Sequence, residues 1–283
     1  QIPDTRCQIK VFENFGEGKK DAIRTGIMKS NGILIITTDG DCKVGPDWLL
    51  SIASFYEKYK PKLISGPVVM EKTYGLFKSF QSMEFMSLVA SGAGSIGVKM
   101  PIMCNGANLA FEKEAYKQAS DNKDLKFASG DDIFLLLKMK KHFGSSSIRF
   151  IKSNDAIVQT HSKKTLKEYI SQRFRWVSKS RGYRDPAIIL VALIVFLFNF
   201  SLLTYSFMAG HFDLLPRFIA GMRIIKVIID LPILLGFSIF ARRGNVMGYY
   251  FIFAIGYVLF VNVAAIVGNL GSGYSWKKRR IRN

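Results

Sequence analysis

Apolar residues follow two different patterns along the chain. As far as residue 185, short apolar stretches alternate with polar and charged ones, whereas charged residues become sparse from residue 186 until the basic tail. The first pattern is typical of a globular domain with its own core, and the second of segments that meet lipid. We therefore expect two parts: a domain at 1–185, and transmembrane or interfacial helices with a basic tail at 186–283.

Within the first part, apolar spacing predicts helices and strands in alternation. Residues 16–30 repeat apolar positions with a helical period, and the continuous apolar run at 33–36 predicts a strand that is buried on both faces. A helix at 46–59 and a strand at 62–70 follow, and a weaker alternation at 7–13 predicts one more strand. Because strands buried on both faces are typical of parallel sheets, this order favours an α/β fold with an open, mostly parallel sheet flanked by helices.

Three apolar segments make up the second part. Residues 187–209 and 247–270 carry no charge, and each exceeds the about 20 residues that a helix needs to cross a bilayer. The segment between them, 214–240, is either a span with a paired polar face or an interfacial or re-entrant helix. Its charged residues are Arg217, Arg223, Lys226 and Asp230.

Basic residues predict how these segments are oriented. Clusters at 163–184 and 277–282 flank the apolar segments, and such clusters favour the cytoplasmic side. Three spans place the tail outside, whereas two spans with the middle segment in the interface place it inside and leave Arg242 and Arg243 facing outward. We expect the second arrangement: a multi-pass protein of the cell inner (cytoplasmic) membrane, with its first domain on the cytoplasmic side.

Charge narrows the choice of partner. The chain has 40 Lys and Arg against 21 Asp and Glu, a formal charge of +19, which favours nucleic acid, acidic lipid or a phosphorylated substrate. Because much of this charge flanks apolar segments, it favours a membrane surface over nucleic acid. The cysteines, Cys7, Cys42 and Cys104, lack metal-ligand spacing and indicate a reducing compartment.

Asp39 and Asp41 directly follow the strand predicted at 33–36. In open α/β sheets, ligands bind beyond the carboxyl ends of the strands. Mg²⁺ typically takes one or two carboxylates together with substrate phosphates. The pair therefore suits a divalent cation that neutralises charge on a departing diphosphate, and the alternative is an Asp-Gly turn with solvated side chains.

Asp131 and Asp132 begin a predicted helix. They either cap the helix and compensate its dipole, or Asp132 acts as a general base toward an attacking hydroxyl. The triplet Gly-Asp-Asp also occurs at the metal site of RNA-dependent polymerases, where it lies at a hairpin tip. Here an amphipathic helix and apolar segments follow, so a polymerase is disfavoured.

Gln172, Arg175 and Trp176 share one face of a basic helix, because they are spaced i, i+3 and i+4. Arg175 suits a diphosphate, and the indole offers a flat face to a sugar or base. The alternative is a juxtamembrane helix with a tryptophan at the interface. Gly106 and Asn108, in "NGANLAF", either line a ligand or make a turn.

Five motifs in a fixed order together carry a family resemblance. "ENFGEGKKDAIRTG", "DGD", "GANLAF", "GDD" and "QRFRW", ahead of the apolar segments, resemble the membrane-associated family 2 glycosyltransferases. Relatives in that family include cellulose and hyaluronan synthases and ceramide glucosyltransferase. The resemblance covers roughly residues 8–180, and the tail "YSWKKRR" is similar to the W-K-G-R ending of many such enzymes. It implies a GT-A fold, a nucleotide-diphospho-sugar donor and inversion of the anomeric centre.

The resemblance also assigns roles to single residues. It implies that Asp39 and Asp41 hold the metal and the nucleotide, and that Asp132 is the catalytic base. The expected substrate contacts are Asp39, Gly106, Asn108, Asp131, Gln172, Arg173, Arg175 and Trp176. Asp131 stands where the family usually has Glu. The family's first βαβ unit should precede residue 1, so we expect a chain truncated at its N-terminus.

These features predict an inverting, hexosyltransferase-type enzyme that depends on Mg²⁺ or Mn²⁺. It would move a sugar from a UDP-sugar to a lipid or polysaccharide hydroxyl at the membrane, with no nucleic-acid partner. The rival hypothesis is a non-catalytic membrane scaffold or regulatory protein that retains the fold. Metal-dependent binding of a nucleotide-sugar separates the two.

Overall fold

The structure is a computed structural model. It describes residues 10–14, 16, 18–72, 74–119, 131–179, 182–208, 215–270, 274–276 and 279–281. The strand expected at 7–13 falls partly outside these residues, and 10–13 do not form a strand. The basic tail at 277–282 also lies partly outside them, although a short hairpin of β8 (Tyr274–Trp276) and β9 (Arg279–Ile281) is described.

A mixed sheet forms the centre of the first domain. Its order is β1-β5-β3-β6, with β1 at Leu34–Thr37, β3 at Leu63–Ser65, β5 at Leu109–Glu112 and β6 at Ile148–Phe150. Strand β5 runs antiparallel to both neighbours, and only β3 and β6 are parallel. The expected mostly parallel sheet is therefore wrong, because an apolar run reports the burial of a strand and not its direction.

Strand β1 lies at an edge of this sheet. Among the described residues it pairs with β5 alone, and all four of its residues are half-buried. The expectation of a strand buried on both faces is wrong here, since an edge strand has a neighbour on one side only. Its position matters for the site, because Asp39 and Asp41 follow directly after Thr37.

The strand expected at 62–70 splits into two strands that belong to different sheets. After β3 the chain passes through Gly66 and Pro67 into β4 (Val68–Met70), which joins a smaller sheet of order β2-β7-β4. The other two strands of that sheet are β2 (Lys43–Val44) and β7 (Val158–Thr160). A Cβ at Gly66 would come within 2.3 Å of the Asn108 amide, so only glycine fits at this crossing.

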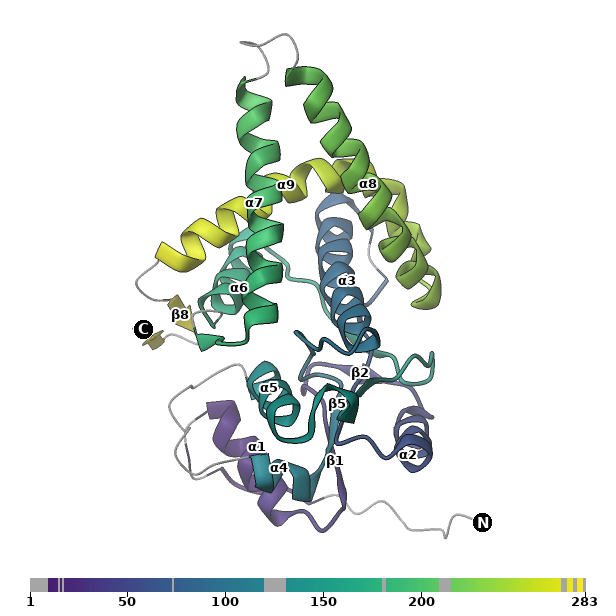
Figure 1. The fold of residues 1–283 in the computed structure, drawn as a ribbon. Helices are drawn as coiled ribbons and strands as arrows, with labels where there is room; N and C mark the ends of the chain where they lie inside the picture. Colours follow the sequence, from purple (N-terminus) through teal and green to yellow (C-terminus); the bar gives the residue numbers. More distant parts are fainter. Residues whose placement is uncertain are drawn as a thin grey trace.

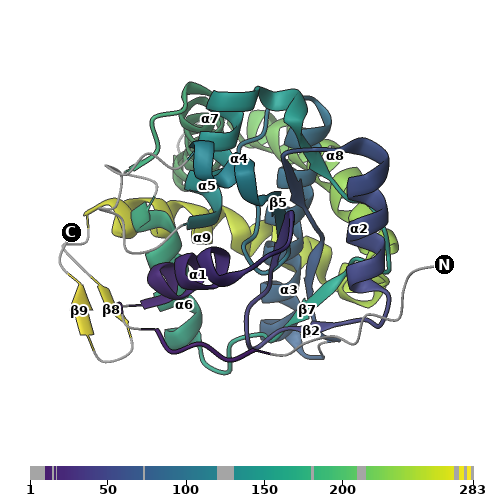
Figure 2. The same ribbon diagram turned by 90° about the horizontal axis from the view of Figure 1, so that it is seen from below.

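Helices cover the main sheet on both sides (Figures 1 and 2). On one side lies α2 (Trp48–Tyr59), and on the other lie α1 (Gly18–Lys29), α4 (Lys113–Ala119) and α5 (Asp131–Phe143). The helices expected at 16–30 and 46–59 are confirmed. The long helix α3 (Leu76–Gly97) carries buried residues on most of its turns and packs against β4 and the C-terminal helices.

The C-terminal part consists of α6 (Leu166–Lys179), α7 (Pro186–Met208), α8 (Leu215–Phe240), the 3₁₀ helix η3 (Gly244–Tyr249) and α9 (Tyr250–Leu270). Helix α7 leads away from the first domain, α8 returns to it, and α9 runs across both (Figure 1). Two helical segments are long and apolar enough, by length and composition, to cross a membrane. They are α7 and Gly244–Ile266, which covers η3 and most of α9. These two helices match the segments predicted at 187–209 and 247–270.

Two contacts fix both ends of the α7–α8 hairpin to the first domain. At the start of α7, Lys140 Nζ lies 2.8 Å from Asp185 Oδ2. Past the end of α8, Arg243 is buried and its Nε donates to the Met70 carbonyl at 2.9 Å. The expected arrangement puts Arg242 and Arg243 on the outer side of the membrane, whereas here Arg243 packs against the first domain because α8 brings the chain back to it.

Candidate active site

One large cavity lies between the main sheet and the C-terminal helices. Its volume is about 2590 Å³, whereas small-molecule sites usually measure roughly 300–1,000 Å³. The cavity therefore has room for more than one small substrate. Seven of the residues expected at the site line it: Asp39, Gly106, Asp132, Gln172, Arg173, Arg175 and Trp176.

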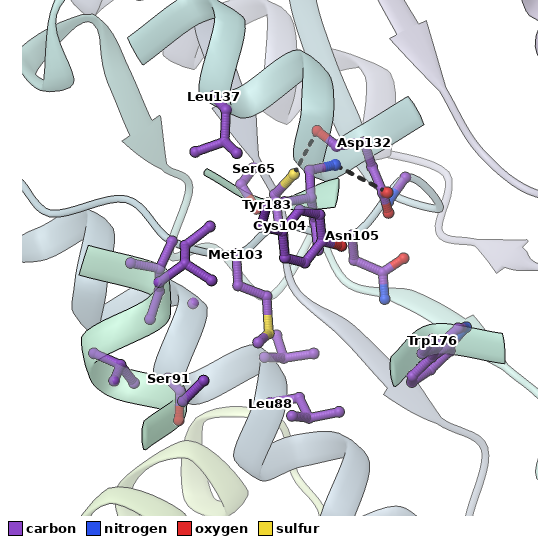
Figure 3. Close-up of a pocket in the computed structure, with 18 of the residues that line it drawn as sticks. Ser65, Leu88, Ser91, Met103, Cys104, Asn105, Asp132, Leu137, Trp176 and Tyr183 are labelled. Atoms are coloured by element: carbon purple, nitrogen blue, oxygen red, sulfur yellow. Dashed lines mark hydrogen bonds between the residues drawn. The ribbon is translucent and has the colours of Figure 1, made fainter. Parts of the chain in front are cut away.

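Polar contacts join three parts of the chain at one end of this cavity: the end of β1, the loop at Gly106 and the start of α5. Thr37, the last residue of β1, donates its hydroxyl to the Gly106 carbonyl at 3.1 Å. The Gly106 N–H in turn donates to Asp132 Oδ2 at 3.0 Å (Figure 3). Asp39 and Asp132 are far apart in sequence, yet these two contacts bring them to the same cavity.

Backbone N–H groups hold the Asp132 carboxylate in place. Besides the Gly106 contact, its Oδ1 accepts from the Ile133 N–H at 3.0 Å, and its carbonyl accepts from Cys104 Sγ at 3.3 Å. Burial raises the pKa of the Cys104 thiol, which keeps it a donor. Burial, with the nearby Asp132 charge, also raises the pKa of Tyr183, which faces the same space (Figure 3). Asp132 thus presents a fixed, half-buried carboxylate to the cavity.

Gly106 has a steric role as well as a polar one. A Cβ at this position would lie 3.3 Å from the Asp132 Cβ, tighter than most side-chain contacts allow. The loop therefore needs glycine here so that its N–H can reach the carboxylate.

Asp39, Asp41 and Cys42 form a cluster whose ligand atoms lie within 4.8 Å of one another. Burial, with the two aspartates adding to it, raises the pKa of the Cys42 thiol, so a thiolate ligand is disfavoured. The two carboxylates remain, and oxygen ligands suit Mg²⁺ or Mn²⁺. Lys19 forms an ion pair with Asp39. A cation at this cluster would compete with that ammonium group or share a substrate phosphate with it.

The structure corrects the expectation for Asn108. Its side chain is buried and is not among those that line the cavity. Its Nδ2 donates to the carbonyls of Pro67 at 2.9 Å and Ala156 at 2.7 Å, and its Oδ1 accepts from Trp48 Nε1 at 3.2 Å. All these partners are protein atoms, so Asn108 holds the crossing between the two sheets. The side chain of Asp131 lies outside the described residues.

Arg173 lines the cavity and also has a partner inside the protein. The guanidinium is buried against Glu84 of α3, with Nε at 2.8 and 2.9 Å from the two carboxylate oxygens. Its expected contact with a substrate stays a prediction, and this internal pair holds the guanidinium in place. Sequence reasoning missed Glu84, although a lone acidic residue in the apolar stretch "SMEFMSLV" signals a buried partner.

Gln172, Arg175 and Trp176 all line the cavity from α6, as their spacing predicts. Trp176 packs beside Phe85 of α3, with ring centroids 6.3 Å apart. Figure 3 shows its indole apart from Asp132, with Asn105 between the two in this view. The arrangement brings the Asp39 carboxylate, the fixed Asp132 carboxylate, an arginine and an aromatic face around one space, with Asp41 beside Asp39.

Comparison with known proteins gives a family match. The model of "Glycosyl transferase family group 2" matches residues 34–267. No curated protein matches the chain. Two solved structures of glucosyl-3-phosphoglycerate synthase from Mycobacterium tuberculosis are similar, one with phosphoglyceric acid and one with Mn²⁺, UDP-glucose and phosphoglyceric acid. They share 16% and 17% identity with a TM-score of 0.38, and the match covers 60% of this chain and 57% of those chains.

Proposed function

The chain belongs to glycosyl transferase family group 2, and from that premise we propose that it is an inverting glycosyltransferase acting at a membrane. The donor is a nucleoside-diphosphate sugar, with a UDP-sugar as the first choice, and the acceptor is a hydroxyl of a lipid or polysaccharide. One observation carries the proposal: Asp39, Asp132 and Trp176 line the same cavity. Residues 1–185 supply the chemistry and residues 186–283 the contact with the membrane.

The proposed reaction uses Asp132 as general base. Its carboxylate takes the proton of the acceptor hydroxyl while the oxygen attacks the anomeric carbon. The bond from that carbon to the diphosphate breaks on the opposite side, which inverts the configuration. The nucleoside diphosphate leaves with the electron pair, and the Gly106 N–H keeps Asp132 in place throughout.

The leaving diphosphate needs positive charge close by. Asp39 and Asp41 would hold Mg²⁺ or Mn²⁺, which neutralises the phosphates when it is bound. Arg175 lines the same cavity and suits a bidentate contact with a phosphate. Trp176 offers its ring face to the sugar or the acceptor.

The cavity extends beyond the space that a nucleotide-sugar needs. Its lining includes apolar side chains of α3, of α7 and of the stretch between α3 and β5: Leu88, Met103, Ile188, Ala192 and Val195. A growing glycan chain is better matched by polar and aromatic walls, whereas an alkyl chain gains from apolar ones. This lining supports a lipid acceptor over a polysaccharide.

Membrane association rests on the C-terminal helices. Apolar residues are exposed along α7, among them Leu190, Leu193, Ile194 and Leu197. Exposed apolar surface on this scale marks a contact with lipid or protein. We place the first domain on the cytoplasmic side of the membrane, with both ends of the α7–α8 hairpin on that same side.

Transfer of radiolabelled sugar from UDP-sugars by the full-length protein in membranes tests the proposal. Asp132→Asn should lower turnover by roughly 10²- to 10⁴-fold, the usual contribution of a general base. Donor binding, measured by calorimetry with Mn²⁺ present, should persist in this variant. A scaffold would bind no donor, and near-normal turnover in Asp132→Asn would show that the assigned base is wrong.

A further inference from the structure

A charged pair is buried where α3 meets α6. Arg173 and Glu84 are each only 4% exposed. The Arg173 Nε lies 2.8 Å from Glu84 Oε1 and 2.9 Å from Oε2, and Nη2 also contacts Oε2. The carboxylate therefore engages two nitrogens of one guanidinium and fixes its plane.

Arg173 in turn contacts two residues that line the cavity, Gln172 and Trp176. Its Nη1 donates to Gln172 Oε1 at 2.9 Å, and its Cζ lies 4.2 Å from the centroid of the Trp176 ring. On the other side Cζ lies 4.7 Å from the Tyr169 ring. Gln172 lines the cavity, and because its Oε1 accepts from Arg173, its amide nitrogen remains a donor.

Stability alone gives little reason to bury this pair. Taking two charges out of water costs about as much as their attraction returns, and apolar residues of similar volume often serve equally well. The surroundings are apolar and aromatic, including Phe85 of α3 beside Trp176. What the pair supplies, and apolar residues would not, is a fixed direction for its neighbours.

We propose that Glu84 is a positioning residue for sugar transfer. Through Arg173 it fixes the amide of Gln172 and the ring of Trp176 as one wall of the cavity. This inference rests on the proposed function, but its structural core, the orientation of Trp176, is measurable without any turnover.

Removing both charges at once gives the main test. A single substitution leaves a buried charge without its partner and endangers folding, so the variant is Glu84→Met with Arg173→Met. It should fold as stably as the wild type, while kcat/KM for transfer falls by about 10- to 100-fold because the wall is misplaced by a fraction of an ångström or more. Unchanged kcat/KM in the folded double variant would overturn the proposal.

A mutant cycle with Trp176 separates positioning from a general structural role. If the pair acts through Gln172 and Trp176, its removal from a Trp176→Ala background should add little, less than about a further two-fold. Effects that multiply would mean that the pair acts independently of Trp176 and would overturn the proposal.

Fluorescence supplies a measurement that does not need activity. The chain has three tryptophans, so Trp48→Phe with Trp276→Phe leaves Trp176 alone. Removing the pair in this background should lower the anisotropy of Trp176 and raise its quenching by acrylamide. Arg243→Met, which removes a buried arginine outside the cavity, is the matched control and should change neither.

The two kinds of measurement have different meanings. Suppose that the wild-type protein transfers no sugar, but that removing the pair lowers the anisotropy of Trp176 and raises its quenching. The proposed function would then be wrong, and the positioning of Trp176 by Glu84 would stand. Unaltered fluorescence would sink the positioning, whatever the turnover.

Discussion

Two regions line the same cavity, and they are built in opposite ways. The carboxylate shelf consists of Asp39, Gly106 and Asp132, which line the cavity, and of Asp41, which lies beside Asp39. It is at most half-buried and is held by a few hydrogen bonds to backbone groups. The helical layer consists of α3, α6, α7, α8 and α9. It includes the turn directly after α8 that carries Arg243, and it is held by apolar packing. Glu84 and Arg173 are buried in it as a pair, and Arg243 is buried against the Met70 carbonyl.

This contrast predicts what substitutions do in each region. On the shelf, charged groups remain close to water, so removing one takes away chemistry and little stability. In the helical layer, Glu84, Arg173 and Arg243 have exchanged water for specific partners, so removing one of them leaves its partner unsatisfied. Activity and stability should therefore respond separately in the two regions.

The largest effect is expected on the shelf. Asp39→Asn combined with Asp41→Asn removes both carboxylates that suit the cation, and transfer should fall by about 10³-fold or more, in line with lost charge stabilisation of the leaving group. Donor binding should lose its dependence on Mn²⁺, which calorimetry with and without the ion measures. Thermal unfolding should hardly change, since exposed carboxylates contribute little to stability. If donor binding still depended on Mn²⁺ in this variant, Asp39 and Asp41 would not be the metal ligands.

The next effect belongs to the helical layer. Arg243→Met leaves the carbonyl of Met70 and the amide oxygen of Gln159 without their donor. We expect the free energy of unfolding to fall by about 3 kcal/mol, as for buried groups bonded to a charge. Urea unfolding in detergent measures it.

Turnover per folded molecule should stay near normal in Arg243→Met, because Arg243 lies outside the cavity. The matched control is the neighbouring exposed arginine, Arg242→Met, which should change stability by less than about 0.5 kcal/mol. Equal losses at both positions would mean that burial does not govern this region.

The sequence predicts the shelf better than the helical layer, for a physical reason. Asp39 and Asp41 follow an apolar strand, and Asp132 begins a helix, so local spacing places each carboxylate near the end of an element. What spacing does not contain is the direction of β5, which makes the sheet mixed. Direction is decided by the connections around the whole sheet, not by the residues within one strand.

Partners in the helical layer are chosen over long sequence separations. Arg173 pairs with Glu84, 89 positions away, and Arg243 donates to Met70, 173 positions away. Both arginines sit in basic stretches that suit phosphate or lipid equally well, so the pattern favours surface roles for them. Only the fold reveals that each is buried.

Asn108 lies at the junction between the two regions and should affect both. Asn108→Ala leaves the carbonyls of Pro67 and Ala156 and the indole N–H of Trp48 without a partner, and we expect a loss of about 2 kcal/mol in unfolding free energy. Turnover should also fall, because Gly106 is two residues away.

Trp48→Phe removes one of the three hydrogen bonds and should cost about 1 kcal/mol. If Asn108→Ala lowered stability but left turnover unchanged, the crossing at Asn108 would not support the carboxylate shelf.

The smallest effect concerns the start of the hairpin and appears only in acid. Burial tends to raise the pKa of Asp185, but hydrogen bonds from Lys140 and from the N–H groups of Ile188 and Ala187 outweigh it and hold the pKa below its ordinary value of 3.8. A carboxyl with a lowered pKa in the folded state contributes stability above the unfolded value and loses it as pH falls through the folded one. Stability should therefore decline below about pH 3.8, by about 1 kcal/mol at most because the pair is partly exposed.

Lys140→Met should flatten this decline in a comparison of unfolding at pH 3 and pH 6, whereas the exposed neighbour Lys141→Met should not. Equal declines in both variants would mean that this ion pair does not anchor α7, and the hairpin would then be held to the first domain by Arg243 and packing alone.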